Sequence, residues 1–326
     1  MTSSYGQSAV ESIEPPEQGF YAKRLRFGGI DIKSHPSIDD RALLAARGKL
    51  EQMLRRIPAV RANLAAAGAE LHIIGAEQAT SDLPENRHLK GRPFEGRLTI
   101  DERTRGTGGL LASCGEENLL RFVRDRYRGR DICVHEFAHT IYSFGTDEPT
   151  RAFFAARYAA AKARGLWNGM FAATNPDEFF AELSMWYFGT HGDPGTLARV
   201  ESGPAWLAAY DPESFALFER FYRGLIPIDQ AMWRRARLVD LEKEREMRSA
   251  PTLTRARLVI RNRTNSELRL YWLDFEGARK LYASIPPLGT STQDTFAHHV
   301  WLLATGNGSA QALAIAVQPA SVLLVE

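Results

Sequence analysis

The sequence predicts an α+β protein of two domains, a mixed helix-and-strand domain followed by a small all-β sandwich. The chain has 326 residues, 44% of them hydrophobic, which is enough for two cores. Several stretches before residue 249 carry apolar residues at helical spacing. Beyond Ser249-Ala250-Pro251 the pattern changes to short alternating or apolar runs broken by Gly, Pro and Asn, which is typical of strands and turns. We therefore expect a disordered tail over 1–18, a first domain over 19–250 and a sandwich over 251–326.

Charge and hydropathy narrow the classes of function. The 41 Lys and Arg residues nearly balance 39 Asp and Glu residues, so the net charge of +2 gives no argument for nucleic-acid binding. No apolar run approaches the length of a membrane span. The sequence Met1-Thr2-Ser3-Ser4-Tyr5-Gly6 lacks the pattern of a signal peptide. We therefore expect a cytoplasmic protein, one exported by another route, or one whose leader is not part of this sequence.

The first domain begins with strands and a long helix. A strand pair or bent strand is expected over 20–32, an amphipathic helix over 37–67 that is interrupted near Pro58, and a buried strand over 70–75. A polar loop over 78–96 leads to a short strand over 98–100. The glycine-rich stretch 103–113 does not follow a strand-to-helix junction, so we favour the rim of a site and an edge strand over a phosphate loop.

Residues 129–145 contain the motif that carries the chemistry. They form one predicted helix, with Asp131 as its N-cap and Gly145 as a left-handed stop. His135 and His139 lie four residues apart, so both imidazoles lie on one face and can bind one metal ion. Glu136 lies beside them, where a general base would take a proton from water. Two histidines on a helix can also be ordinary polar residues.

A second predicted helix supplies candidate carboxylates. It begins after Asn175, with Pro176 in its first turn, and ends at Gly189. Glu178 and Glu182 share a face of this apolar helix. This helix can supply the third metal ligand, and the position of Glu178 three residues after Asn175 also suits a capping box. A buried Glu182 needs a partner, and the second nitrogen of a ligand histidine is a natural one.

The two motifs together resemble the zincin metallopeptidases whose third ligand is glutamate, in the branch that contains anthrax lethal factor and the bacterial Pro-Pro endopeptidases. The resemblance covers about residues 130–190. It implies Zn²⁺ held by His135, His139 and Glu178, with Glu182 orienting a ligand histidine. That branch has a tyrosine seven residues before the ligand glutamate, where its hydroxyl stabilises the tetrahedral intermediate. Phe171 occupies this position here, so the resemblance leaves the catalytic power open.

The two cysteines flank the candidate site. Cys114 and Cys133 can form a disulfide in an oxidising compartment, and Cys133 can equally be a small buried hydrophobic residue of the metal helix. Further helices are expected over 149–164, 212–222 and 228–248. His191, in the loop after Gly189, is either solvated or part of the cleft.

The C-terminal region resembles the β domain of the von Hippel–Lindau tumour suppressor. The resemblance runs almost without gaps over about fifty residues, from Ile260-Arg261-Asn262-Arg263-Thr264 to His299-Val300-Trp301-Leu302. In that family the domain binds hydroxyproline in an aromatic box. The matching positions here are Trp272, Tyr282, Thr295, His299 and Trp301, with threonine where the family has serine. The same aromatic side chains could instead fill the sandwich core. The helical part that recruits a ubiquitin ligase has no counterpart in this sequence.

These observations favour a zinc endopeptidase that uses Glu136 as general base. Its substrate would be a protein or peptide, directed to the site by a proline or hydroxyproline that the C-terminal domain binds. The alternative is a zincin with weak or no activity that serves as a proline-peptide binding protein, for which Phe171 is the main argument.

Overall fold

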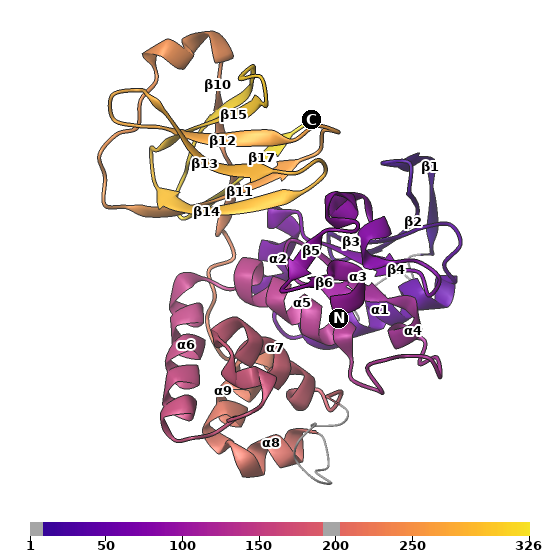
Figure 1. The fold of residues 1–326 in the computed structure, drawn as a ribbon. Coiled ribbons are helices and arrows are strands. Elements are labelled where there is room, and N and C mark those ends of the chain that lie inside the picture. The colour runs from indigo at the N-terminus through magenta and orange to yellow at the C-terminus, as the bar shows by residue number, and fades with distance from the viewer. Residues whose placement is uncertain (1–8, 192–202) are drawn as a thin grey trace, which may run out of the picture. The chain divides into compact units, whose positions relative to one another are not determined.

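The computed structural model describes residues 9–191 and 203–326, and the chain divides into two compact units (Figure 1). The first unit comprises Met1–Thr80 and Ile100–Gln230, and the second comprises Ser81–Thr99 and Ala231–Glu326. The first unit mixes helices and strands, whereas the second consists mainly of strands. The predicted α+β class with a β-rich C-terminal region is therefore confirmed.

A mixed sheet forms the centre of the first unit. Its strand order is β1-β2-β3-β4-β8-β7, in which β3, β4 and β8 run parallel and the other neighbours are antiparallel. The glycine-rich stretch provides the edge strand β7, as predicted. The strands are β1 Glu11–Glu17, β2 Tyr21–Phe27, β3 Ile30–Ser34, β4 Glu70–Ile74, β7 Gly106–Thr107 and β8 Leu111–Gly115.

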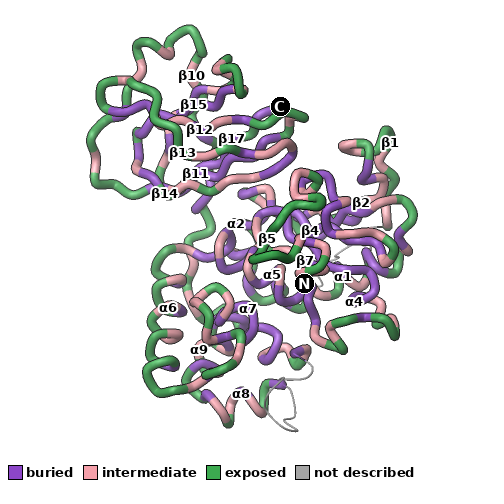
Figure 2. Tube along the Cα trace, viewed as in Figure 1, coloured by how far each residue is buried: buried purple, intermediate pink, exposed green. Residues whose placement is uncertain are grey.

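The helices of the first unit bring the two candidate motifs together. Helix α5 packs on strand β8, and helix α7 packs on α5. Both helices are buried along most of their length, as the purple stretches in Figure 2 show. The helices are α1 Asp40–Leu54, α2 Pro58–Ala67, α3 Ile100–Arg103, α4 Glu116–Leu119, α5 Ile132–Thr140, α6 Glu148–Ala163, α7 Pro176–Tyr187, α8 Pro204–Tyr210 and α9 Pro212–Tyr222, with a π-helical turn at Ile141–Gly145 and a 3₁₀ turn at Phe171–Ala173.

The second unit contains a β sandwich with strand orders β10-β16-β15-β12-β13 and β14-β11-β17-β9. Its core includes Leu258, Leu270, Trp301 and Leu323. The unit also contains a hairpin and the 3₁₀ turns Pro84–Leu89 and Leu241–Glu246, and a third 3₁₀ turn, Thr80–Asp82, begins one residue before it. The strands are β5 Pro93–Glu95, β6 Leu98–Thr99, β9 Trp233–Arg235, β10 Arg237–Val239, β11 Arg255–Asn262, β12 Leu268–Leu273, β13 Arg279–Ile285, β14 Thr290–Phe296, β15 Val300–Thr305, β16 Ala310–Ile315 and β17 Ala320–Val325.

The predicted disordered tail over 1–18 is wrong for the part that the structure describes. Residues 11–17 form strand β1, which pairs with β2 at the edge of the sheet. Glu11 and Glu17 form ion pairs with Arg24 and Lys33, both at 2.9 Å. Two prolines are tolerated in this strand because an edge strand can leave N–H positions unpaired. Residues 1–8 lie outside the described part.

The predicted helix over 228–248 is also wrong. Residues 233–235 form β9 and pair with β17, and residues 237–239 form β10 and pair with β16. Pairing with the sandwich overrides the helical pattern of this charged stretch, because it buries Trp233 and Ala236. As a result the C-terminal segment of the second unit begins at Ala231, before the predicted boundary at 250. The unit also includes residues 81–99.

Two glycines that were predicted as helix stops have different roles. Gly189 follows α7 with a left-handed φ of +69°, as expected for a stop. Gly145 does not adopt that conformation. A Cβ at Gly145 would lie 2.6 Å from Val60 Cγ1, so this glycine allows α2 to pack closely against the π-helical turn. The predicted break near Pro58 is confirmed, since α2 begins there.

Candidate functional site

Helix α5 is anchored at its N-terminus by Asp131, as predicted. The carboxylate of Asp131 accepts a hydrogen bond from the Val134 backbone N–H at 3.2 Å, and it lies 2.6 Å from Lys49 Nζ. Asp131 is itself buried. This cap fixes the first turn of the helix that carries His135, Glu136 and His139.

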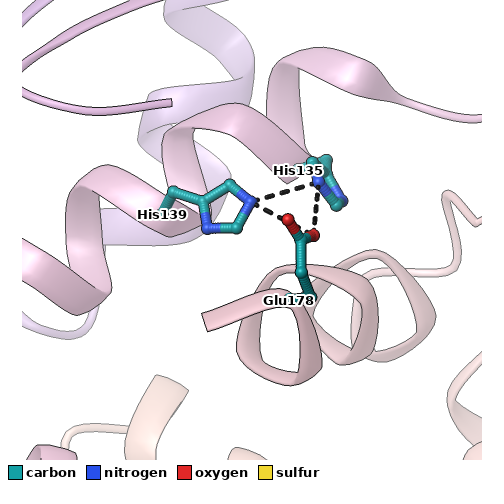
Figure 3. A group of neighbouring side chains, drawn as sticks. All are labelled: His135, His139 and Glu178. Atoms are coloured by element: carbon teal, nitrogen blue, oxygen red, sulfur yellow. Dashed lines mark hydrogen bonds and ion pairs between the residues drawn. The ribbon is translucent and has the colours of Figure 1, made fainter. Parts of the chain in front are cut away.

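The structure brings His135, His139 and Glu178 together at one point between α5 and α7 (Figure 3). The Nε2 atoms of the two histidines are 3.2 Å apart, and Glu178 Oε2 lies 3.3 Å from His135 Nε2 and 3.5 Å from His139 Nε2. Ligands about 2.0–2.1 Å from a tetrahedral ion lie about 3.3–3.4 Å from one another. The three atoms therefore have the spacing of one face of a zinc tetrahedron.

The histidines and glutamates of this cluster shift one another's pKa values. Glu178 Oε2 is buried and receives no hydrogen bond among the described residues. Burial raises the pKa of Glu178, but the two histidines outweigh it and lower that pKa to about 2. Burial lowers the pKa of His135, but Glu178 and Glu182 outweigh it and raise that pKa to about 10. Two imidazoles and one carboxylate are a donor set that Zn²⁺ accepts, so the residues fit this metal.

Glu136 lies on α5 between the two histidines and faces the edge strand β7. Burial raises the pKa of its carboxyl, with smaller opposing contributions from His135 and His139. A Cβ at Gly106 would lie 3.0 Å from Glu136 Cγ, and one at Gly108 would lie 2.7 Å from His139 Cβ. The glycines of the rim are therefore required for β7 and the loop after it to approach the helix.

Glu182 lies one turn after Glu178 and is buried behind His135. Its Oε1 atom is 3.1 Å from His135 Nδ1 and 2.5 Å from Arg130 Nη2, and its Oε2 atom is 2.9 Å from His191 Nε2. Burial raises the pKa of Glu182, but His135 and His191 lower it well below its ordinary value. Glu182 Oε1 lies at ion-pair distance from His135 Nδ1 without a hydrogen bond of standard geometry. The negative charge of Glu182 favours a proton on that nitrogen, which would leave Nε2 for a metal.

The sequence did not identify Arg130 as a partner of Glu182, and it placed His191 in solvent or in a cleft. His191 is instead 2% exposed and bound to Glu182. Its position two residues after the left-handed Gly189 was an available signal, because such a stop turns the chain back toward its own helix. Arg130 precedes the N-cap of α5, and no pattern in the sequence distinguishes it from its arginine-rich neighbours.

Phe171 lies beside the histidines on the 3₁₀ turn before α7. Its ring centroid is 6.4 Å from that of His135, and the side chain is 42% exposed. The side chain offers an apolar face and no hydroxyl donor at this place.

Cys114 and Cys133 form a disulfide between β8 and α5, with their Cα atoms 5.1 Å apart. Both residues are fully buried. Of the two alternatives for Cys133, the structure contains the disulfide. This bond ties helix α5 to the sheet two residues before His135.

A second candidate site lies in the sandwich, where the five predicted residues form one cluster. Trp272 lies 6.3 Å from Tyr282 and 5.3 Å from His299, and Tyr282 lies 5.0 Å from Trp301, measured between ring centroids. Trp301 Nε1 donates to Thr295 Oγ1 at 3.2 Å, and Thr295 Oγ1 lies 3.4 Å from His299 Nδ1.

The members of this aromatic cluster differ in burial. Trp301 belongs to the sandwich core, whereas Tyr282 is 52% exposed. Burial lowers the pKa of the His299 imidazole. The sequence missed Phe275, an exposed ring that lies 5.2 Å from Trp272 and 6.0 Å from His299. The cluster therefore combines a buried ring, Trp301, with the exposed rings of Tyr282 and Phe275.

The fold and the two sites define an α+β protein that joins a His-Glu cluster to a β sandwich bearing an aromatic cluster. A family model described as the VHL beta domain matches residues 247–318. The C-terminal region is thus a VHL-like β module, as its sequence predicts. No curated protein gives a significant match to the chain. Among the described residues, no helix is long and apolar enough to cross a membrane.

Proposed function

We propose that this protein is a zinc-dependent endopeptidase of the glutamate-zincin type. The observation that carries the proposal is the spacing of His135 Nε2, His139 Nε2 and Glu178 Oε2, which is 3.2–3.5 Å. An ion bound by three protein groups keeps its fourth position open, which is the arrangement of catalytic rather than structural zinc. The sequence resemblance of the two helices to zincins supports the same conclusion.

In this proposal each residue of the site has a separate task. Zinc would supply Lewis-acid chemistry for the scissile carbonyl and would acidify the attacking water. Glu136 takes the proton of that water and later delivers it to the leaving amine, a role that its raised pKa suits. Glu182 keeps His135 in the tautomer that binds metal. The edge strand β7 can pair with an extended substrate backbone.

The experiment for this function compares two Glu-to-Gln variants. The zinc-loaded full chain should cleave proline-containing peptides, and Glu136→Gln should keep its zinc but lose at least about 10²-fold in turnover, the usual contribution of a positioned general base. Glu51→Gln changes an exposed glutamate of α1 in the same way and should leave turnover intact. Unchanged turnover in Glu136→Gln would show that the base is another group.

The second candidate function is that of a binding protein whose zincin half has weak activity or none. Phe171 favours it, because no hydroxyl is present where a zincin of this branch places its tyrosine. Zinc binding without turnover of any peptide by the wild-type chain would support this alternative. Zinc binding together with turnover would reject it.

We further propose that the aromatic cluster binds a prolyl ring and prefers 4-hydroxyproline. The exposed faces of Trp272 and Tyr282 suit a rigid pyrrolidine, and Thr295 and His299 can exchange hydrogen bonds with its hydroxyl. The match to the VHL beta domain supports a substrate-binding module here. Loss of the ligand hydroxyl would leave buried polar groups unpaired at about 1–3 kcal/mol. This corresponds to roughly five- to 150-fold in affinity.

Calorimetric titration of the full chain with matched proline and hydroxyproline peptides tests this preference. Thr295→Val keeps the shape of the side chain, removes its hydroxyl and should reduce the difference between the two peptides. Thr292→Val, at an exposed position of the same strand, should not change it. Equal binding of both peptides by the wild-type chain would remove the hydroxyl-reading role. No binding of either would make the module structural.

A further inference from the structure

Glu182 is held by three side chains from two segments of the first unit. Its Oε1 atom faces His135 and Arg130, and its Oε2 atom is 2.9 Å from His191 Nε2. Arg130 and His135 flank the start of α5, whereas His191 comes from the segment after α7. Because an ionised carboxylate only accepts hydrogen bonds, His191 must donate through its Nε2–H. Without this bond, Oε2 would lose the one hydrogen bond that it receives from the described residues.

His191 is held by an aromatic stack and by a backbone hydrogen bond of the residue before it. Its ring is stacked on Trp186, with centroids 4.1 Å apart and planes 17° from parallel. Trp186 is stacked in turn on Trp206 at 4.1 Å. The preceding residue, Thr190, accepts a backbone hydrogen bond from Asp131, the N-cap of α5, at 2.9 Å. The ring is therefore held both by the aromatic stack and by the helix that carries the metal ligands.

Packing alone does not account for a histidine at this position. His191 is 2% exposed, and its Nδ1 atom is buried without a hydrogen-bond partner among the described residues. Leaving a buried nitrogen unpaired destabilises a fold. A phenyl ring would make the same stack on Trp186 without that cost. The contact that a phenyl ring could not make is the bond from Nε2 to Glu182.

We propose that His191 is a positioning residue of the metal centre, which acts on the metal ligand His135 through Glu182. This inference rests on the proposed zinc site. The bond from His191 fixes the Oε2 side of the carboxylate, so that Oε1 stays directed at His135 Nδ1. The His135 ring then keeps its Nε2 atom directed at Glu178 and His139 before any metal arrives.

Two substitutions of His191 separate positioning from packing. His191→Phe keeps a flat ring on Trp186 but removes the donor, whereas His191→Gln keeps an N–H donor near the place of Nε2 but removes the ring. The readouts are the zinc dissociation constant in competition with a chelator, the visible spectrum of the Co²⁺-substituted protein, and the melting temperature of the metal-free protein. We expect His191→Phe to weaken zinc binding about tenfold, the lower range for residues that support a ligand. His191→Gln should retain the zinc affinity and the cobalt spectrum of the wild type.

The outcomes distinguish this inference from the proposed function. If the wild-type chain does not bind zinc, the proposed function itself fails. If the wild type binds zinc and His191→Phe binds it equally, only the positioning role is wrong. It is also wrong if His191→Gln weakens zinc binding as much as His191→Phe does. Should His191→Phe not fold, the cobalt spectrum of His191→Gln decides, since an unchanged spectrum supports the role and an altered one rejects it.

Discussion

Loss of the Cys114–Cys133 disulfide should destabilise the first unit by an amount that the structure allows us to calculate. The two residues are separated by 19 positions, so the bond closes a loop of about 20 residues. For such a loop, the chain-entropy model gives a stabilisation of about 3 kcal/mol at 25 °C. For a unit of roughly 200 residues, this corresponds to a lower melting temperature by roughly 6–12 °C.

The assay is calorimetry of the metal-free protein in three forms, namely the oxidised wild type, the reduced wild type and the double variant Cys114→Ala/Cys133→Ala. The reduced wild type shows the loss of the cross-link alone, and the double variant adds the loss of two buried sulfur atoms. We expect the transition of the first unit to shift and that of the sandwich to stay. A reduced wild type that melts at the same temperature as the oxidised form would refute the reasoning.

Three further predictions concern the metal site. Phe171→Tyr should leave peptidase activity equal or raise it, since it adds a hydroxyl beside His135, and a sharp loss would show that the cleft uses the apolar ring. Burial lowers the pKa of His135, but two facing glutamates outweigh it and raise that pKa to about 10, so zinc must displace a proton at neutral pH. Zinc affinity should therefore rise about tenfold per pH unit below that pKa. Calorimetry in buffers of different ionisation enthalpy should detect the released proton. Zinc binding without proton release would contradict this prediction. Gly108→Ala should weaken zinc binding because its Cβ would lie 2.7 Å from His139 Cβ. The control Gly48→Ala, within α1, would place a Cβ with no atom within 4 Å and should leave zinc binding unchanged. Measuring the zinc affinity of both variants by chelator competition distinguishes a local clash from a general effect.

The local elements of the candidate metal centre could be predicted because each depends on residues close in sequence. The four-residue spacing of His135 and His139 places both on one face of a helix whatever that helix contacts. Asn175 caps α7 through the backbone N–H of Glu178 at 2.8 Å, as its position suggested. Glu178 nevertheless also faces the histidines, so the capping position and the metal-site position are compatible.

The features that the sequence did not predict depend on contacts between distant residues. Strand β1 exists because β2 pairs with it, and β9 and β10 exist because the sandwich accepts them at its edges. Gly145 suited a stop signal, but the contact with Val60 on α2 explains it. The proposed role of His191 could be inferred only from its distance to Glu182, because no pattern in the sequence of the loop indicates this contact.

The measurement that tests the central claim most directly is the metal content of the full chain after dialysis against a zinc buffer. The account predicts one zinc per chain in the wild type and loss of most of it in Glu178→Gln. Asp177→Asn, at the exposed neighbouring position of the same helical turn, should keep the zinc. A wild-type chain without zinc, or a Glu178→Gln variant that binds zinc as tightly as the wild type, would contradict the proposed metal centre.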